Sequence, residues 1–217
     1  MLTINGNPIT INGNFINRVI GGLPPYTLRL KFQDDFIPTF SKGTGVQIST
    51  YPNIWELTYE NTDWTYLLQY QQRLLEVMSG NTSNVSSTNY TFFYCNSLSS
   101  ISLFDTSNIT TMASMFGECS ALTTVPLFDT SNVTNMSEMF YDCRSLSSIP
   151  LFDTSKVRYM QGMFYYCRNV QYGALALYNQ ASTQVNPPMY HSKTFYNCGI
   201  NRQTGSGELA QIPSNWK

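Results

Sequence analysis

The chain has 217 residues, and only 12% of them are charged, about half the usual share of roughly 25%. Twelve Lys and Arg against 13 Asp and Glu give a formal net charge of -1, which excludes a polybasic nucleic-acid surface because such binding depends on phosphate neutralisation. With 42% hydrophobic and 14% aromatic residues, the chain is not a disordered one. Its polarity comes from uncharged Asn, Ser, Thr, Gln and Tyr, a composition typical of recognition surfaces and extracellular repeat proteins.

Residues 1–60 predict a β-rich module that anchors or oligomerises the protein. The segment 3–7 recurs at 10–14, and each copy contains an Asn-Gly turn signal. Further strands are expected at 26–32, 45–49 and 54–59. The first residues contain neither a basic segment nor an apolar run, and no run approaches the roughly 20 residues of a membrane span. We therefore expect neither a secretory signal nor a membrane-spanning segment.

The centre of the chain is a repeat marked by cysteines. Cys95, Cys119, Cys143 and Cys167 are each 24 residues apart, and Cys198 follows. Residues 103–126 and 127–150 are near-identical copies, beginning LFDTSNITTM and LFDTSNVTNM, and residues 151–174 begin LFDTSKVRYM. A degenerate copy precedes them and a half-copy follows. Self-similarity at this period predicts a leucine-rich-repeat-like solenoid of about four to five turns over residues 79–172.

Each 24-residue turn is predicted to contain a short strand, a polar corner and a short helix. Leu146, Ile149 and Leu151 have the spacing of a strand whose leucines face inward. Apolar side chains between 136 and 146 recur at helical spacing, and Asn135 with Glu138 forms a plausible capping pair. The fold class is therefore an α/β repeat.

The aspartates of the corner allow two interpretations. Asp105, Asp129 and Asp153 recur at one place, as in a ladder of calcium ligands. One carboxylate per turn is few for such a site, so hydrogen bonding by Asp and Thr side chains to the corner backbone is favoured. No metal and no cofactor are expected.

Both ends of the stack need caps, because an open end exposes the apolar core. Residues 61–78 are predicted to form a capping helix, whose apolar positions include Trp64, Leu67, Leu68, Leu74 and Leu75. Residues 173–217 form the distal cap, with a predicted helix at 174–182 and the last half-repeat.

The repeat DTSNVTNMSEMFYDCRSLSSIP resembles that of BspA-like leucine-rich-repeat surface proteins of bacteria, some protozoa and their phages. The resemblance covers about residues 79–172. It implies exposure at a surface, adhesion, and binding of host proteins or glycans without catalysis.

Two sets of residues are singled out for roles. The first set varies between turns on the expected outer face and is rich in Tyr and Arg, the residues that most often anchor interfaces. Its members are Tyr141, Arg144, Tyr159, Tyr165, Tyr166 and Arg168. An ordinary solvated face is the alternative interpretation. The second set is structural, a buried F-x-x-C ladder. Its members are Phe92, Phe116, Phe140, Phe164, Phe195 and the five cysteines.

Phe104, Phe128 and Phe152 follow the inward leucines by one residue. If strand alternation continues there, they point outward as an apolar stripe. If the chain has already bent, they belong to the core. We expect core or subunit packing.

No catalytic residue is predicted, since the one histidine, His191, has no evident partner and no nucleophile motif occurs. The sequence predicts a non-enzymatic binding or adhesion protein. The leading hypothesis is a phage virion component, such as a fibre, tail or head-decoration protein at the virion surface. Its partners would be other virion proteins, a bacterial surface protein or a glycan. It would form a homo-oligomer, and the resemblance to phage fibres and decorations implies a trimer. The alternative is a bacterial cell-surface adhesin.

Overall fold

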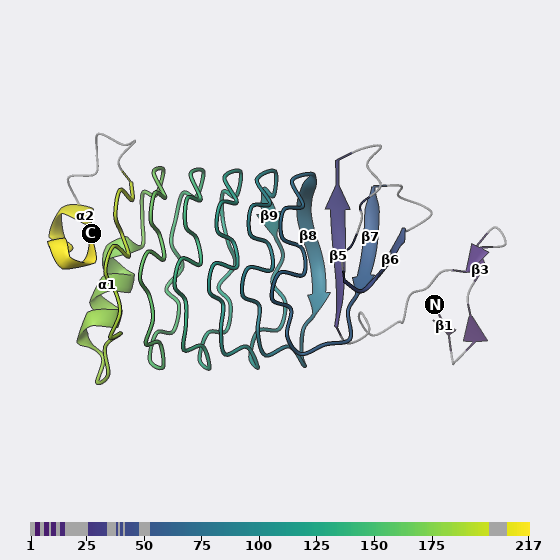
Figure 1. Ribbon diagram of the computed structural model, residues 1–217, viewed down its shortest axis with the longest axis horizontal. Helices are drawn as coiled ribbons and strands as arrows, with labels where there is room; N and C mark the ends of the chain where they lie inside the picture. Colours follow the sequence, from purple (N-terminus) through teal and green to yellow (C-terminus); the bar gives the residue numbers. More distant parts are fainter. Residues whose placement is uncertain are drawn as a thin grey trace.

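The computed structural model describes residues 26–33, 38, 40, 42–47, 53–199 and 208–217, together with the backbone of four short strands before residue 16. The fold is mixed α/β, with one open five-stranded sheet and few helices (Figure 1). One continuous hydrophobic core extends from Leu28 in the sheet to Trp216 at the C-terminal end.

The first strands form two antiparallel pairs. β1 (Thr3–Ile4) pairs with β2 (Asn7–Pro8), and β3 (Thr10–Ile11) pairs with β4 (Asn14–Phe15). The two segments predicted from the duplicated Asn-Gly signal are thus both in strands.

The five-stranded sheet has the order β6-β7-β5-β8-β9. Its members are β5 (Thr27–Phe32), β6 (Thr44–Gln47), β7 (Ile54–Thr58), β8 (Leu74–Asn81) and β9 (Ser100–Ile101). All neighbours are antiparallel except β8 and β9. In β5, Leu28, Leu30 and Phe32 alternate into the core, as expected for a strand with period two. The three predicted strands are confirmed, although residues 48 and 49 lie outside the described residues. The sheet crosses the expected module boundary at residue 60.

The predicted capping helix over 61–78 is wrong. Residues 65–70 form turns and β8 begins at Leu74. The apolar residues are buried as expected, but the backbone amides of Trp64, Tyr66 and Leu68 donate to carbonyls of residues 87–91 in the next copy. Those donors are therefore not used within a helix.

Successive copies lie side by side, joined by backbone hydrogen bonds between residues about 24 positions apart (Figure 1). Parallel bridges join Ser87 to Thr111, Thr111 to Asn135, and Asn135 to Tyr159. Within residues 82–172, all of them described, β9 is the one strand, so the short strand expected in each turn is wrong for the later copies. They are joined there by separate bonds, such as Ser147 N–H to the Thr123 carbonyl at 3.0 Å.

The short helix predicted in each copy is also wrong, and residues 137–142 form turns. The backbone amides have two kinds of acceptor. The Phe116 amide donates to the Met139 carbonyl of the next copy, whereas the Cys119 amide donates to the Phe116 carbonyl three residues earlier. Glu138 and Asp142 also have φ of 56° and 55°, the left-handed region, which no right-handed helix contains. Asn135 accepts the Ser137 amide at 2.9 Å, but it caps no helix.

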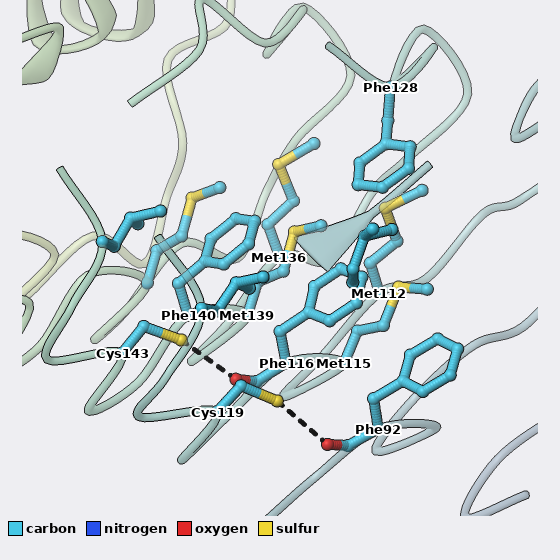
Figure 2. Packing of buried hydrophobic residues seen from close by; sticks show 14 of the residues in the cluster. Phe92, Met112, Met115, Phe116, Cys119, Phe128, Met136, Met139, Phe140 and Cys143 are labelled. Carbon is cyan, nitrogen blue, oxygen red and sulfur yellow. Dashed lines mark hydrogen bonds between the residues drawn. The ribbon is translucent and has the colours of Figure 1, made fainter. Parts of the chain in front are cut away.

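The interior of the stack is built from identical side chains placed above one another (Figure 2). Phe92, Phe116, Phe140, Phe164 and Phe195 are all buried, and neighbouring rings stack at 5.3–5.9 Å between centroids. All five cysteines are buried free thiols. Each of Cys119, Cys143 and Cys167 donates its S–H to a phenylalanine carbonyl 27 residues earlier, at 3.0–3.1 Å.

The polar corner is held by Asp and Thr side chains, which confirms the hydrogen-bonding interpretation. The Asp129 carboxylate accepts the amide and hydroxyl of Ser131 at 3.0 and 2.7 Å. The buried Thr130 hydroxyl donates to the Asp153 carbonyl of the next copy at 2.9 Å. Thr106 does the same toward Asp129 at 2.8 Å. These side chains thereby satisfy amide and carbonyl groups of the corner backbone.

The leucines expected to face inward at 103, 127 and 151 are exposed, and the phenylalanines that follow them are buried. Leu127 is 59% exposed and Phe128 is 2% exposed. Phe128 stacks on Phe116 at 6.0 Å. The chain has therefore bent before Phe128, and of the two alternatives the phenylalanines belong to the core.

The C-terminal end contains the described helices. α1 (Ala174–Thr183) confirms the helix predicted at 174–182 and buries Ala174, Leu177 and Ala181. α2 (Glu208–Gln211) and the 3-10 helix η1 (Ser214–Trp216) follow. The Trp216 carbonyl accepts the Phe195 amide at 2.9 Å, so the last residues pair with the final turn of the stack.

Candidate functional site

The tyrosine face is a group of aromatic side chains on adjoining copies, formed by Tyr141, Tyr165, Tyr166 and Tyr196. Tyr141 stacks on Tyr165 at 5.3 Å, and Tyr165 stacks on Tyr196 at 4.9 Å. Tyr166 meets Tyr165 edge-on at 4.4 Å. Each of Tyr141, Tyr165 and Tyr196 directly follows a buried phenylalanine of the core ladder, so the same register that stacks the core also stacks the tyrosines. All four rings remain at least partly exposed.

The two arginines of the predicted set are held differently. The Arg168 guanidinium lies over the Tyr166 ring, 4.9 Å from its centroid, and so belongs to the tyrosine face. Arg144 forms a bidentate ion pair with Asp142, at 2.8 and 2.6 Å. Its side chain remains largely exposed beside the face.

Acidic side chains border the tyrosine face and set its electrostatics. Partial burial raises the pKa of the Tyr141 hydroxyl, and the charges of Asp142, Glu118 and Glu138 raise it further. The pKa of Tyr165 is also raised, first by burial and then by its hydrogen bond with Tyr166. Burial raises the pKa of Glu118, with a further contribution from the Asp142 charge. Both tyrosine hydroxyls therefore keep their protons at neutral pH and can donate hydrogen bonds.

A second aromatic group covers the first copies of the stack. Tyr66 stacks on Tyr90 at 4.9 Å, and Tyr70 contacts both Phe93 and Tyr94. Between the two groups the aromatic column is interrupted at Gly117, where an added Cβ would lie only 2.8 Å from the Phe93 ring. The outer face is thus aromatic at both ends and acidic in the middle.

Tyr159 does not join the tyrosine face. It lies in the column of parallel bridges and stacks on Tyr190 at 4.9 Å, with an interplanar angle of 2°. The structure therefore brings together four of the six predicted binding residues, places Arg144 beside them, and pairs Tyr159 elsewhere.

Sequence reasoning missed Tyr190, Tyr196 and the second aromatic group. A signal for Tyr196 was present, because it follows Phe195 as Tyr165 follows Phe164. Tyr190 had the same kind of signal, because it precedes Phe195 by five residues as Tyr159 precedes Phe164.

The five cysteine thiols are buried, and the ring of the one histidine packs against a tryptophan. Burial raises the pKa of Cys95 and of Cys198 to about 12, and those of Cys119, Cys143 and Cys167 are also raised by burial. His191 stacks on Trp216 at 4.2 Å. Among the described residues, no cluster of three His, Cys, Asp or Glu side chains is arranged to hold a metal ion. No helix in the described part of the chain is long and apolar enough to span a membrane.

A mixed α/β fold with a stacked 24-residue repeat and an aromatic outer face defines a class of repeat proteins. Residues 63–201 match the family described as "Mycoplasma protein of unknown function, DUF285", and the chain belongs to this family. The match fits a BspA-like repeat surface protein. Neither the curated proteins nor the solved structures contain a match.

Proposed function

We propose that this protein is a non-enzymatic binding protein that presents the tyrosine face at a surface. The observation that supports it is the contrast between a core of repeated residues and a Tyr- and Arg-rich outer face that changes from copy to copy. Protonated phenol hydroxyls donate, nearby carboxylates accept, and ring edges add apolar contact. This chemistry suits a polar, neutral ligand such as a glycan or a polypeptide surface.

The proposal includes the architecture, a leucine-rich-repeat-like solenoid of about four to five turns. The inter-copy hydrogen bonds, the phenylalanine ladder and the family match support it. In such an array each copy is stabilised mainly by its neighbours, so outer positions vary at little cost in stability.

The absence of catalysis is part of the proposal. The thiols are buried and hold their protons, so they are poor nucleophiles at neutral pH. A screen against host polysaccharides and peptides that released a product would overturn this part.

The binding role is tested by single substitutions on the tyrosine face. Tyr165→Ala removes the ring that contacts Tyr141, Tyr166 and Tyr196, and Tyr172→Ala is the matched control, since Tyr172 is 65% exposed and lies outside the face. Labelled protein is incubated with candidate target cells and the bound fraction is measured. We expect Tyr165→Ala to reduce binding at least about tenfold and Tyr172→Ala to leave it unchanged. Equal loss in both variants would contradict the proposal.

Two places of display are proposed. The first is the surface of a phage particle, as a fibre, tail or head-decoration component that contacts the bacterial host. The second is the bacterial cell surface, which the BspA-like character of the family match favours. Mass spectrometry of purified particles and of the surface fraction of cells free of phage distinguishes them, since each location predicts the protein in one fraction only. Light scattering on the purified protein tests the proposed homo-oligomer, and a monomeric mass would refute it.

A further inference from the structure

A hollow of about 560 Å³ lies where the C-terminal segment departs from the 24-residue period. This volume is in the usual range for a small-molecule site. It lies outside the set of residues that forms the tyrosine face. The lining residues are Thr134, Ser155, Lys156, Arg158, Val185, Asn186, Pro187 and Met189.

The repeat changes its chemistry at this hollow. Where the two preceding copies read Asn-Ile-Thr and Asn-Val-Thr at 108–110 and 132–134, the third reads Lys156-Val157-Arg158. Two neutral side chains are thus replaced by two cations, in a chain that has only 12 Lys and Arg residues.

The replaced residues had structural roles that the cations do not repeat. The hydroxyls of Thr110 and Thr134 each donate to the carbonyl one copy earlier, both at 3.1 Å. Arg158 has the same backbone bond, from its amide to the Thr134 carbonyl at 2.9 Å, but its guanidinium has no hydrogen-bond partner among the described residues. Lys156 is oriented by Asn132, whose side-chain oxygen accepts from its ammonium group at 2.6 Å. The structure thus presents an unpaired guanidinium at the wall of a hollow.

The segment that contributes residues 185–187 and Met189 to the lining is fixed to the stack through Gln184. The Gln184 side chain accepts the Thr154 hydroxyl at 2.9 Å and donates to the Thr154 carbonyl at 2.8 Å. It also donates to the Asn186 carbonyl at 2.9 Å. Val185, which is 97% exposed, and Met189, which is 66% exposed, line the hollow together with the two cations. A wall held in this way needs little ordering when a ligand binds.

We propose that this hollow binds a carboxylated sugar residue, such as a uronic acid of an acidic polysaccharide. Arg158 would hold the carboxylate in a bidentate pair and Lys156 would add a second positive charge. The polar groups of Thr134, Ser155 and Asn186 match sugar hydroxyls. This site is distinct from the tyrosine face and does not depend on the function proposed for that face.

The probe is digalacturonic acid, compared by calorimetry with its dimethyl ester, which has the same rings without the charges. The double variant K156N/R158T restores the residues that the preceding copies carry, so it is expected to fold. K193Q removes an exposed cation that lies outside both the hollow and the tyrosine face, and it is the charge control. We expect the acid to bind at least about tenfold more tightly than the ester, the double variant to lose at least about tenfold in affinity, and K193Q to bind as the parent does. Added salt should weaken the binding.

Several results would overturn the proposal. They are equal affinity for acid and ester, equal loss in K193Q and the double variant, or no measurable binding of the acid. Acetate binding as tightly as the disaccharide would show that the sugar is not recognised. A short glutamate-rich peptide that displaces the acid with higher affinity would assign the hollow to an acidic polypeptide instead.

Discussion

The repeat stack has an inner column of buried side chains that is uniform and an outer column that varies from copy to copy. At the inner phenylalanine position the residue is the same in five copies, and the rings stack at 5.3–5.9 Å. One position later, on the outside, the residues are Phe93, Gly117, Tyr141, Tyr165 and Tyr196. The same backbone register therefore supports both a uniform column and a variable one.

This difference separates stability from recognition. Inner side chains are close-packed against their counterparts in the next copy, so any change in volume affects two interfaces. Outer side chains contact one another through stacked or edge-on rings and remain partly exposed. Substitutions on the two sides should therefore have effects of very different size.

The largest expected loss of folding stability occurs at alkaline pH and comes from the five thiols acting together. Burial raises the folded-state pKa of Cys95 and Cys198 to about 12, above the ordinary thiol value of 9.0, and it raises that of the other three. The unfolded chain then loses its thiol protons first, so stability is complete below about pH 9 and falls as pH rises toward 12.

Urea unfolding at a series of pH values measures this loss. Cys143→Ala, which keeps all the tyrosines, should show a shallower alkaline loss than the parent. An unchanged slope would mean that the thiols do not cause the loss.

Phe140→Ala is the largest single effect expected inside the stack. Phe140 is fully buried between Phe116 and Phe164, so its removal should lower the free energy of unfolding by about 3–5 kcal/mol. The neighbouring change Tyr141→Ala removes one stacked, half-buried ring and should cost about 1 kcal/mol. Chemical denaturation of both variants gives the comparison, and similar losses would contradict the division into inner and outer columns.

Thr130→Val is expected to have an intermediate effect. It keeps the buried shape but removes the hydroxyl that donates to the Asp153 carbonyl at 2.9 Å, which should cost about 1–2 kcal/mol. The exposed Thr124 is the control, and Thr124→Val should change stability by less than about 0.5 kcal/mol. A thermal-unfolding scan would refute the corner's role if the two variants behaved alike.

The sequence predicted what depends on repetition and missed what depends on backbone geometry. The period, the buried Phe and Cys columns and the Asp-Thr corner all follow from residues that recur every 24 positions. The helices expected at 61–78 and 136–146 were wrong because the same apolar spacing is also compatible with the turns that these segments form. Amides such as that of Phe116 pair with the next copy, and residues such as Glu138 adopt positive φ. Neither feature leaves a signal in hydrophobic periodicity.

The candidate site was predicted in part for the same reason. Tyr141, Tyr165 and Tyr166 lie in complete copies, so their columns could be assigned by counting. The hollow at Arg158 depends on the path of the chain between residue 174 and the last half-repeat, and no repeat constrains that path. The hollow also combines residues of segments distant in sequence, which a single copy cannot reveal.

The smallest effect is expected at Leu127, although its side chain is as apolar as those of the core. Leu127 is 59% exposed and the next residue, Phe128, is 2% exposed. Substitutions at these two neighbours therefore compare an outward-facing side chain with an inward-facing one. Leu127→Ser should change the free energy of unfolding by no more than about 0.5 kcal/mol. Phe128→Ala should lower it by about 3–5 kcal/mol.

Denaturant unfolding of the parent and of these two variants, at a series of protein concentrations, makes the comparison. If Leu127→Ser were the more damaging change, the chain would bend after this pair and not before it, and the leucines would be the inner column. If its effect grew with protein concentration, the exposed leucines at 103, 127 and 151 would be covered by another copy. Their exposure in the single chain would then reflect an interface between copies.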